Sequence, residues 1–394
     1  MRVEDIRLRS LALGLTFVAA ACGENPARPT APDQPRSAVA ANTDIVRQLL
    51  NTLQPHDRAA SRIPIVVGAG DIARCYPGFD ATQFTPPGPE NPAWQTADLL
   101  ESIPGTVIAV GDNAYELGAL TPDYTGCYGP TWGRPAIKAR TRPAAGNHEY
   151  LSGTTGYLAY FGAQAGPPGL YYYGYDVGSW HVIVLNSTPQ VYLCWAPELT
   201  EAGADPAEVP PEFRPGIAPP ANVGVAAGRA CAGDAAQQAW LVAELTAHRR
   251  DRCTLVYFHH PRFSSGMHGN HYQMQRIWDI MYAFGVDVVI DGHDHLYERF
   301  APQTSEGVRD DRWGIRQFTV GTGGAEFYGV SQRQPNSEVV INDTHGVIAL
   351  ALDRNRYGWA FVGVDHSVRD AGSTACHGAP LERLVPSLEP SPSR

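Results

Sequence analysis

Short runs of β-branched and aromatic residues recur along the chain, separated by segments of small, polar or helix-forming residues. Runs of this kind predict buried strands. Apolar residues at helical spacing predict an amphipathic helix over 235–249 and a short helix over 43–53. Strands that alternate with helices favour an α/β fold with a sheet-rich C-terminal half. The predicted strands are residues 63–67, 106–110, 181–185, 254–258, 286–290, 317–320 and 346–352.

Both ends of the chain differ in composition from this central part, which we assign to one domain over 61–370. Residues 1–22 have a basic start and an apolar run too short to span a membrane, which predicts an export signal. Residues 23–60 are rich in Pro and Ala and predict a tether that carries the short helix, with the tether extended as far as about Ala41. Residues 371–394 predict a flexible tail.

The export signal has two interpretations, because it ends in Ala19-Ala20-Ala21-Cys22-Gly23. This segment is similar to the lipobox of bacterial lipoproteins, in which the cysteine is acylated, and a lipidated Cys22 would attach the protein to a membrane. Plain cleavage near the alanines is the alternative. In either case we expect an exported protein that is periplasmic, extracellular or lipid-anchored at the cell envelope.

The net charge and the cysteine content indicate which partners and which cellular compartment suit the protein. The chain has 394 residues and a formal net charge of −10, which argues against nucleic acid as a structural partner. Six cysteines remain when Cys22 is set aside, an even number that suits disulfides in an oxidising compartment. Cys194 and Cys231 bracket a Pro/Ala-rich insertion, so we expect them to pair, although the sequence alone does not fix the connectivity.

Five clusters of metal-ligand residue types follow the predicted strands or an extended segment around Arg142. Glycines let the backbone turn sharply there, and loops at the carboxyl ends of strands can converge on one centre. A single Gly-Asp pair is usually only a turn, but five clusters at segment ends together indicate a site. No serine has a nucleophile motif around it, which argues against a serine hydrolase. The clusters are Gly-Asp71, Gly-Asp112-Asn-Ala-Tyr115, Gly-Asn147-His148-Glu149, His259-His260-Pro and Gly-His293-Asp-His295.

In this order the five clusters resemble the motifs of the calcineurin-like metallophosphoesterases, and within them the purple acid phosphatase branch, over residues 65–300. The resemblance implies a four-layered α/β/β/α sandwich of two mixed β-sheets flanked by helices. It also implies two metal ions bridged by Asp112. His259 fits the pattern better than His260, because the family ligand is followed by one residue and then Pro. The implied ligands are Asp71, Asp112, Tyr115 and His295 for one metal, and Asp112, Asn147, His259 and His293 for the other.

The same resemblance implies roles for the metals and for two further histidines. A phenolate from Tyr115 suits Fe(III), with Fe, Zn or Mn as the second metal. His148 is the implied general acid, oriented by Glu149 or a main-chain carbonyl. His268 is the implied substrate-facing histidine, and His271 is a weaker alternative. A second interpretation of His268 is that it is simply an exposed loop residue without a role in the site. The chain departs from the family in having Ile72-Ala73 where a second glycine is usual, and in lacking a sizeable N-terminal β-domain.

The expected activity is therefore hydrolysis of small phosphate monoesters, of the acid phosphatase type, by metal-bound hydroxide. Two cations can hold both the attacking and the leaving oxygen of an in-line displacement. A phosphodiesterase or nucleotidase on the same scaffold is the alternative, since loops around the site set substrate choice. The 195–230 insertion is expected to shape those loops. A non-catalytic surface lipoprotein is the third interpretation.

Overall fold

The computed structural model describes residues 36–53, 63–76, 82–195, 234–248 and 253–378. Within this part, thirteen strands form two sheets, and both sheets are mixed. The first sheet has the order β13-β12-β11-β1-β2-β3, in which β1, β2 and β3 are parallel to one another. Its strands are β1 (Ile65–Ala69), β2 (Thr106–Val110), β3 (Thr141–Ala144), β11 (Gly346–Asp353), β12 (Arg356–Gly363) and β13 (Val368–Ala375).

The second sheet has the order β10-β8-β9-β7-β6-β5-β4, and its central strands β5, β6, β7 and β9 are parallel. The two sheets face each other: the rings of Tyr297 and Phe361 stack with centroids 4.2 Å apart, and Trp180 Nε1 donates to Asp353 O at 2.6 Å. The strands are β4 (Tyr173–Val177), β5 (Trp180–Val184), β6 (Thr254–Tyr257), β7 (Val288–Asp291), β8 (Tyr297–Phe300), β9 (Arg316–Val320) and β10 (Ser337–Ile341).

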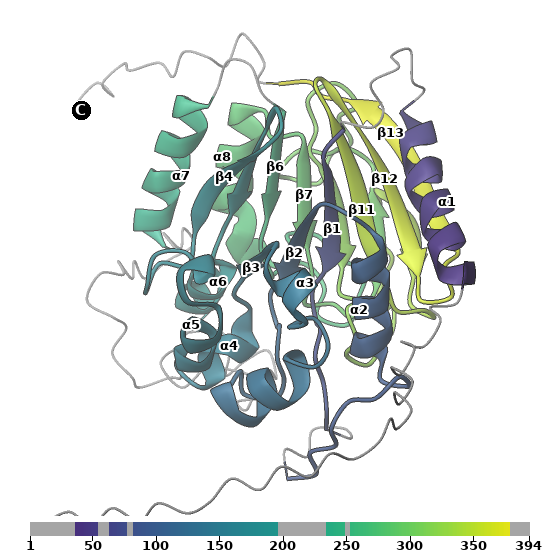
Figure 1. The fold of residues 1–394 in the computed structure, drawn as a ribbon. Coiled ribbons are helices and arrows are strands. Elements are labelled where there is room, and N and C mark those ends of the chain that lie inside the picture. Colours follow the sequence, from purple (N-terminus) through teal and green to yellow (C-terminus); the bar gives the residue numbers. More distant parts are fainter. Residues whose placement is uncertain (1–35, 54–62, 77–81, 196–233, 249–252, 379–394) are drawn as a thin grey trace, which may run out of the picture. The chain divides into compact units, whose positions relative to one another are not determined.

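Helices cover the outer faces of both sheets, with α1 and α2 beside the first and α7 and α8 beside the second (Figure 1). Every residue of β1 and β5 is buried, as expected for strands covered on both faces. The fold is therefore the predicted α/β/β/α sandwich. The helices are α1 (Arg36–Thr52), α2 (Pro92–Ser102), α3 (Pro135–Lys138), α4 (Asn147–Leu151), α5 (Thr155–Phe161), α6 (Ser187–Trp195), α7 (Ala235–Ala247) and α8 (Gln275–Phe284).

The predicted tether was too long at its C-terminal end. Helix α1 begins at Arg36, inside the segment expected to be extended, because the chain after Pro35 has no proline until Pro55 and is rich in helix formers. Ile45 and Leu49 of this helix are buried and belong to the hydrophobic core. The domain thus includes α1 and does not begin at residue 61.

The predicted tail also began too early. Strand β13 continues to Ala375 and pairs with β12, so residues 371–375 belong to the sheet. Gly372, which reads as a flexible residue in sequence, lies against the indole of Trp359: a Cβ at this position would come within 2.3 Å of that ring. The glycine is therefore a packing requirement of the strand pair.

Among the described residues, two disulfides join segments far apart in the chain, Cys75–Cys127 and Cys253–Cys376. The second fastens the end of β13 to the start of β6. The expected Cys194–Cys231 pair, the 1–22 signal and the 196–230 insertion lie outside the residues whose side chains the structure describes. Among the described helices, none has the length and apolar character that a membrane span needs.

Candidate metal centre

The sequence clusters lie in loops that follow the carboxyl ends of parallel strands in both sheets. Asp71 and Asp112 come two residues after β1 and β2, and Asn147 is the first residue of α4, after β3. His259 and His293 come two residues after β6 and β7 of the other sheet. His293 N donates to Asp71 Oδ2 at 2.8 Å, which joins a loop of one sheet to a loop of the other. All seven predicted ligands are at most 8% exposed.

Sharp backbone turns make this convergence possible. Asp71, Asp112 and His293 all have positive φ, at 58°, 47° and 68°, a conformation that costs energy for a non-glycine residue. Glycines packed against these residues leave space for their side chains. For example, a Cβ on Gly146 would come within 2.2 Å of Asp112 Oδ1. The Gly of each Gly-Asp or Gly-Asn motif is therefore part of how the side chains are brought together.

One group of donors surrounds the hydroxyl of Tyr115. Its Oη lies 2.9 Å from Asp71 Oδ1 and 3.1 Å from His295 Nε2. The same Oη lies 3.3 Å from Asp112 Oδ2, and His295 Nε2 lies 3.3 Å from Asp71 Oδ1. These are the four residues predicted to hold the first metal, and their donor atoms face one another.

The second group shares Asp112 with the first. His259 Nε2 lies 3.1 Å from Asp112 Oδ2, and donor atoms of Asp112, His259 and His293 all lie within 4.8 Å of one another. Asn147 sits between Gly146 and His148, which both contact Asp112. Its side-chain Oδ1 is buried and has no hydrogen-bond partner among the described residues. An orphaned buried acceptor of this kind calls for a ligand, and a metal ion fits it.

Hydrogen bonds fix which nitrogen each histidine presents. Nδ1 of His259 lies 3.0 Å from Val110 O, and Nδ1 of His295 lies 2.6 Å from Glu326 O. If each Nδ1–H donates to its carbonyl, Nε2 of each ring is left as a lone pair directed at the carboxylates. The donor set of carboxylate, amide, phenol and imidazole groups therefore fits metal ions in adjacent positions sharing Asp112.

The electrostatic field at the centre is strongly negative. Burial disfavours the charged form of His259, but the carboxylates of Asp112 and Asp71 outweigh it and raise the pKa of His259 to about 10. Burial, again with Asp71 and Asp112, raises the pKa of the Tyr115 phenol well above its ordinary value. Carboxylates that hold a proton on an imidazole this firmly also favour a metal cation in its place.

Glu149 has a role that its place in the motif did not reveal. Its carboxylate is fully buried and accepts from the backbone amides of Gly146, Asn113 and Asp112 at 2.7, 2.8 and 3.0 Å. It also accepts from Tyr124 Oη at 2.9 Å. Glu149 thus ties the loop after β3 to the loop after β2, so that Asp112 and Asn147 keep their relative positions.

We expect Glu149→Ala to lower the free energy of unfolding by about 3 kcal/mol or more, because four buried donors lose their acceptor. Urea unfolding of the metal-free protein measures this loss apart from any change in metal affinity. The matched control is Glu101→Gln, which removes an exposed carboxylate that pairs with Arg134 and is expected to cost less than about 1 kcal/mol. Equal losses in the two variants would contradict the structural role of Glu149.

His148 lies at the open side of the same centre. Its Nδ1 is 2.5 Å from Glu116 O, so the main-chain carbonyl, and not Glu149, orients the ring. Nε2 then faces the centre, 3.8 Å from Asp112 Oδ2. The Tyr115 ring packs against it with centroids 4.4 Å apart. This placement suits the predicted general acid.

Three further histidines, His260, His268 and His271, pack around the ring of His293. The ring of His268 stacks on it with centroids 4.3 Å apart, and those of His260 and His271 lie 4.5 and 5.0 Å away. His260 and His271 are buried, and Ser187 Oγ lies 2.8 Å from His260 Nδ1. His268 is less buried and therefore fits the substrate-facing position better than His271.

Arg74 and Tyr328 were not predicted from the sequence. The buried guanidinium of Arg74 pairs with Glu116 and Glu326, the two residues whose carbonyls lie against His148 and His295. Tyr328 stacks on His295 with ring centroids 3.9 Å apart. Neither residue is part of a metal-ligand motif, and the folded chain was needed to find their contacts.

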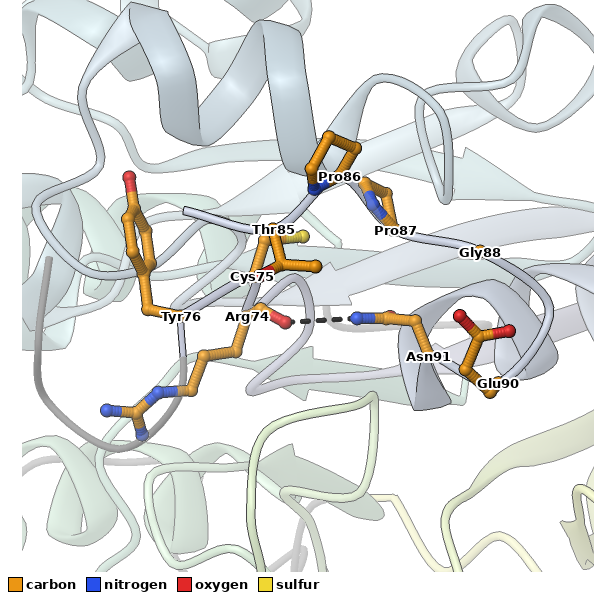
Figure 2. A pocket seen from close by; sticks show the side chains of 9 residues that line it. All are labelled: Arg74, Cys75, Tyr76, Thr85, Pro86, Pro87, Gly88, Glu90 and Asn91. Carbon is orange, nitrogen blue, oxygen red and sulfur yellow. Dashed lines mark hydrogen bonds between the residues drawn. The ribbon is translucent and has the colours of Figure 1, made fainter. Parts of the chain in front are cut away.

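A pocket of about 260 Å³ lies beside Arg74 (Figure 2). Asn91 Nδ2 donates to the main-chain oxygen of Arg74 at 3.1 Å, whereas the guanidinium turns away from Asn91 and Pro87. None of the residues that line the pocket is a predicted site residue. We therefore assign Arg74 to the support of the metal centre, through its ion pairs with Glu116 and Glu326. Its lining residues are Arg74, Cys75, Tyr76, Thr85, Pro86, Pro87, Gly88, Glu90 and Asn91.

Comparisons with known proteins bear on one segment of the sequence and on the fold. No family model matches the sequence. Over 93 residues the chain is 36% identical to purple acid phosphatase 18 of Arabidopsis thaliana, a match that covers 22% of this chain and only 21% of that relative.

Two solved structures share the fold. Purple acid phosphatase PPD1 from yellow lupin (Lupinus luteus) has a TM-score of 0.53 at 18% identity, covering 84% of this chain and 57% of that chain. GAP50, the anchor in the inner membrane complex of Plasmodium, has a TM-score of 0.50 at 13% identity, covering 80% of this chain and 90% of its own. The chain therefore has the fold of these two structures, and a short segment of it is similar in sequence to a purple acid phosphatase.

Proposed function

We propose that this protein is a metal-dependent phosphatase that hydrolyses small phosphate monoesters at a two-metal centre. The observation that carries the proposal is the convergence of six of the predicted donors in two groups that share Asp112. Asp71, Tyr115 and His295 would hold one ion with Asp112, and Asn147, His259 and His293 the other. Bound metal ions would supply positive charge for the phosphoryl oxygens and a lowered pKa for the attacking water.

The protein's own residues would orient the substrate and supply the proton. Nδ1 of His148, if it donates to Glu116 O, leaves Nε2 to carry the proton that the leaving oxygen receives. Its side chain is 14% exposed, so a substrate can reach it. His268, stacked on His293, would contact the phosphate from the other side of the centre.

The test is hydrolysis of an aryl phosphate monoester beside the matching diester by the purified, metal-replete protein. We expect the monoester to be preferred, and chelation followed by dialysis to remove the activity. Preference for the diester would move the function to phosphodiester cleavage at the same centre. Hydrolysis of neither ester, with metals bound, would favour a non-catalytic binding protein.

We further propose Fe(III) at the Tyr115 side, with Fe, Zn or Mn as the second metal. Burial and two carboxylates hold the Tyr115 phenol neutral, and a trivalent ion offsets them better than a divalent one. The oxidised protein should absorb in the visible range through a phenolate-to-iron transition, and Tyr115→Phe should lose that band. A colourless iron-replete protein would contradict phenolate ligation.

Export is the remaining part of the proposal. The Cys75–Cys127 and Cys253–Cys376 disulfides suit an oxidising compartment. The mass of the mature N-terminal peptide distinguishes a lipidated Cys22 from plain cleavage near the alanines.

A further inference from the structure

The carboxylate of Asp294 fastens the loop that carries His268 to the loop that carries His293 and His295. Asp294, the residue between those two histidines, is fully buried. Its Oδ1 accepts from the backbone amide of His268 at 2.9 Å, and its Oδ2 accepts from the hydroxyl of Ser264. Both carboxylate oxygens of Asp294 are therefore used to hold the ends of the segment 264–268.

The segment 264–268 packs closely against the Asp294 carboxylate and neighbouring residues. A Cβ on Gly266 would come within 2.3 Å of the Asp294 carboxyl carbon, so the glycine lets the loop close over the carboxylate. Ser265 donates through its amide and hydroxyl to Glu298, at 2.8 and 2.5 Å. Ser331 Oγ donates to Gly266 O at 2.5 Å. Of these hydrogen bonds, the one to Asp294 is made by His268 itself.

The result is a fixed place for the His268 ring. It stacks on His293 with the planes 30° apart, and Tyr328 packs edge-to-face against it with ring centroids 5.2 Å apart. We propose that Asp294 is a positioning residue that presets His268 for the phosphate group of the substrate. The role of His268 in this proposal rests on the proposed function. The attachment of its loop rests on the hydrogen bonds to Asp294.

The first experiment measures the attachment without reference to activity. In the metal-free protein, hydrogen exchange at the His268 amide should be at least about tenfold faster in Asp294→Ala than in the wild type, because the acceptor of that N–H is gone. The matched control is Asp291→Asn. Asp291 is also fully buried and precedes the same histidine pair, but it accepts from Thr319 and not from the loop. Unchanged exchange in Asp294→Ala, or an equal change in Asp291→Asn, would overturn the inference.

The second experiment measures the consequence for phosphate binding, with inorganic phosphate as a competitive inhibitor and metal content checked at each step. We expect His268→Ala and Asp294→Ala each to raise the inhibition constant roughly tenfold, the worth of one strong hydrogen bond. The double variant should be no worse than His268→Ala alone. Asp294→Asn keeps an acceptor for the amide and should restore most of the affinity.

The outcomes separate this inference from the proposed function. An additive double variant would mean that Asp294 acts through the metal ligands beside it, which overturns the positioning role. A His268→Ala variant with wild-type phosphate inhibition would overturn the substrate role of His268 within the proposed function, while hydrogen exchange still decides the attachment. If Asp294→Ala does not fold, Gly266→Ala provides the same displacement from the loop side, and it should raise the inhibition constant as well.

Discussion

We expect Asp112→Asn to lose turnover by roughly three orders of magnitude or more, because it removes the one carboxylate shared by both donor groups. Asp112 Oδ2 lies 3.3 Å from Tyr115 Oη and 3.1 Å from His259 Nε2. An amide has the same shape but no negative charge, and only one oxygen with which to bind. The variant should keep the fold, because the Asp112 amide still donates to Glu149 and an Asn oxygen can still accept from the His148 amide.

The control for this variant is a second carboxylate that contacts a histidine away from the centre. Asp176 Oδ1 lies 3.0 Å from His181 Nδ1, in a group with His248 whose donor atoms are also within 4.8 Å of one another. We expect Asp176→Asn to keep full activity and metal content, whereas Asp112→Asn should bind fewer than two metal ions per chain. Full activity in Asp112→Asn would refute the site, and loss of activity in Asp176→Asn would direct attention to the Asp176 group.

Strands made of continuous apolar runs were predicted well, because their sequence alone requires burial on both faces. Residues 106–110 are β2 without a change of boundary, and 254–258 differs from β6 by one residue. Strand β12 was not predicted, since two of its eight positions are glycine. Gly358 is needed there because a Cβ would come within 2.2 Å of Thr52 Oγ1 in α1. That close approach between distant segments leaves no local pattern.

The same distinction applies to the metal centre. The seven donors were predicted because they lie in short motifs near strand ends, and the order of those motifs resembles that of a known family. Their ligand roles stay predictions, and the structure adds that six of them converge in two groups that share Asp112. Glu149, Arg74 and Asp294 support the centre through contacts to backbone groups or to other side chains from distant loops. Nothing in their sequence neighbourhood specifies those partners, so the folded chain was needed to find them.

The second large effect is expected for His148→Ala, and its size should depend on the leaving group. General acids contribute about 10²- to 10⁴-fold when the departing oxygen is basic, and little when it leaves as a stable anion. Alkyl phosphate hydrolysis should therefore fall by that factor in kcat, whereas hydrolysis of a nitrophenyl phosphate should fall by less than about tenfold. Steady-state kinetics on the two substrates measure the difference.

Geometry explains why this histidine and not its neighbours should show the dependence on the leaving group. Nδ1 of His148 lies against Glu116 O, which leaves Nε2 facing the centre at a partly exposed position. His260, by contrast, is fully buried behind His293, and its Nδ1 lies against Ser187 Oγ. His260→Ala should therefore lower kcat by the same factor for both substrates. An equal loss for both substrates in His148→Ala, with two metal ions still bound, would mean that His148 orients the phosphate and that the proton comes from another group.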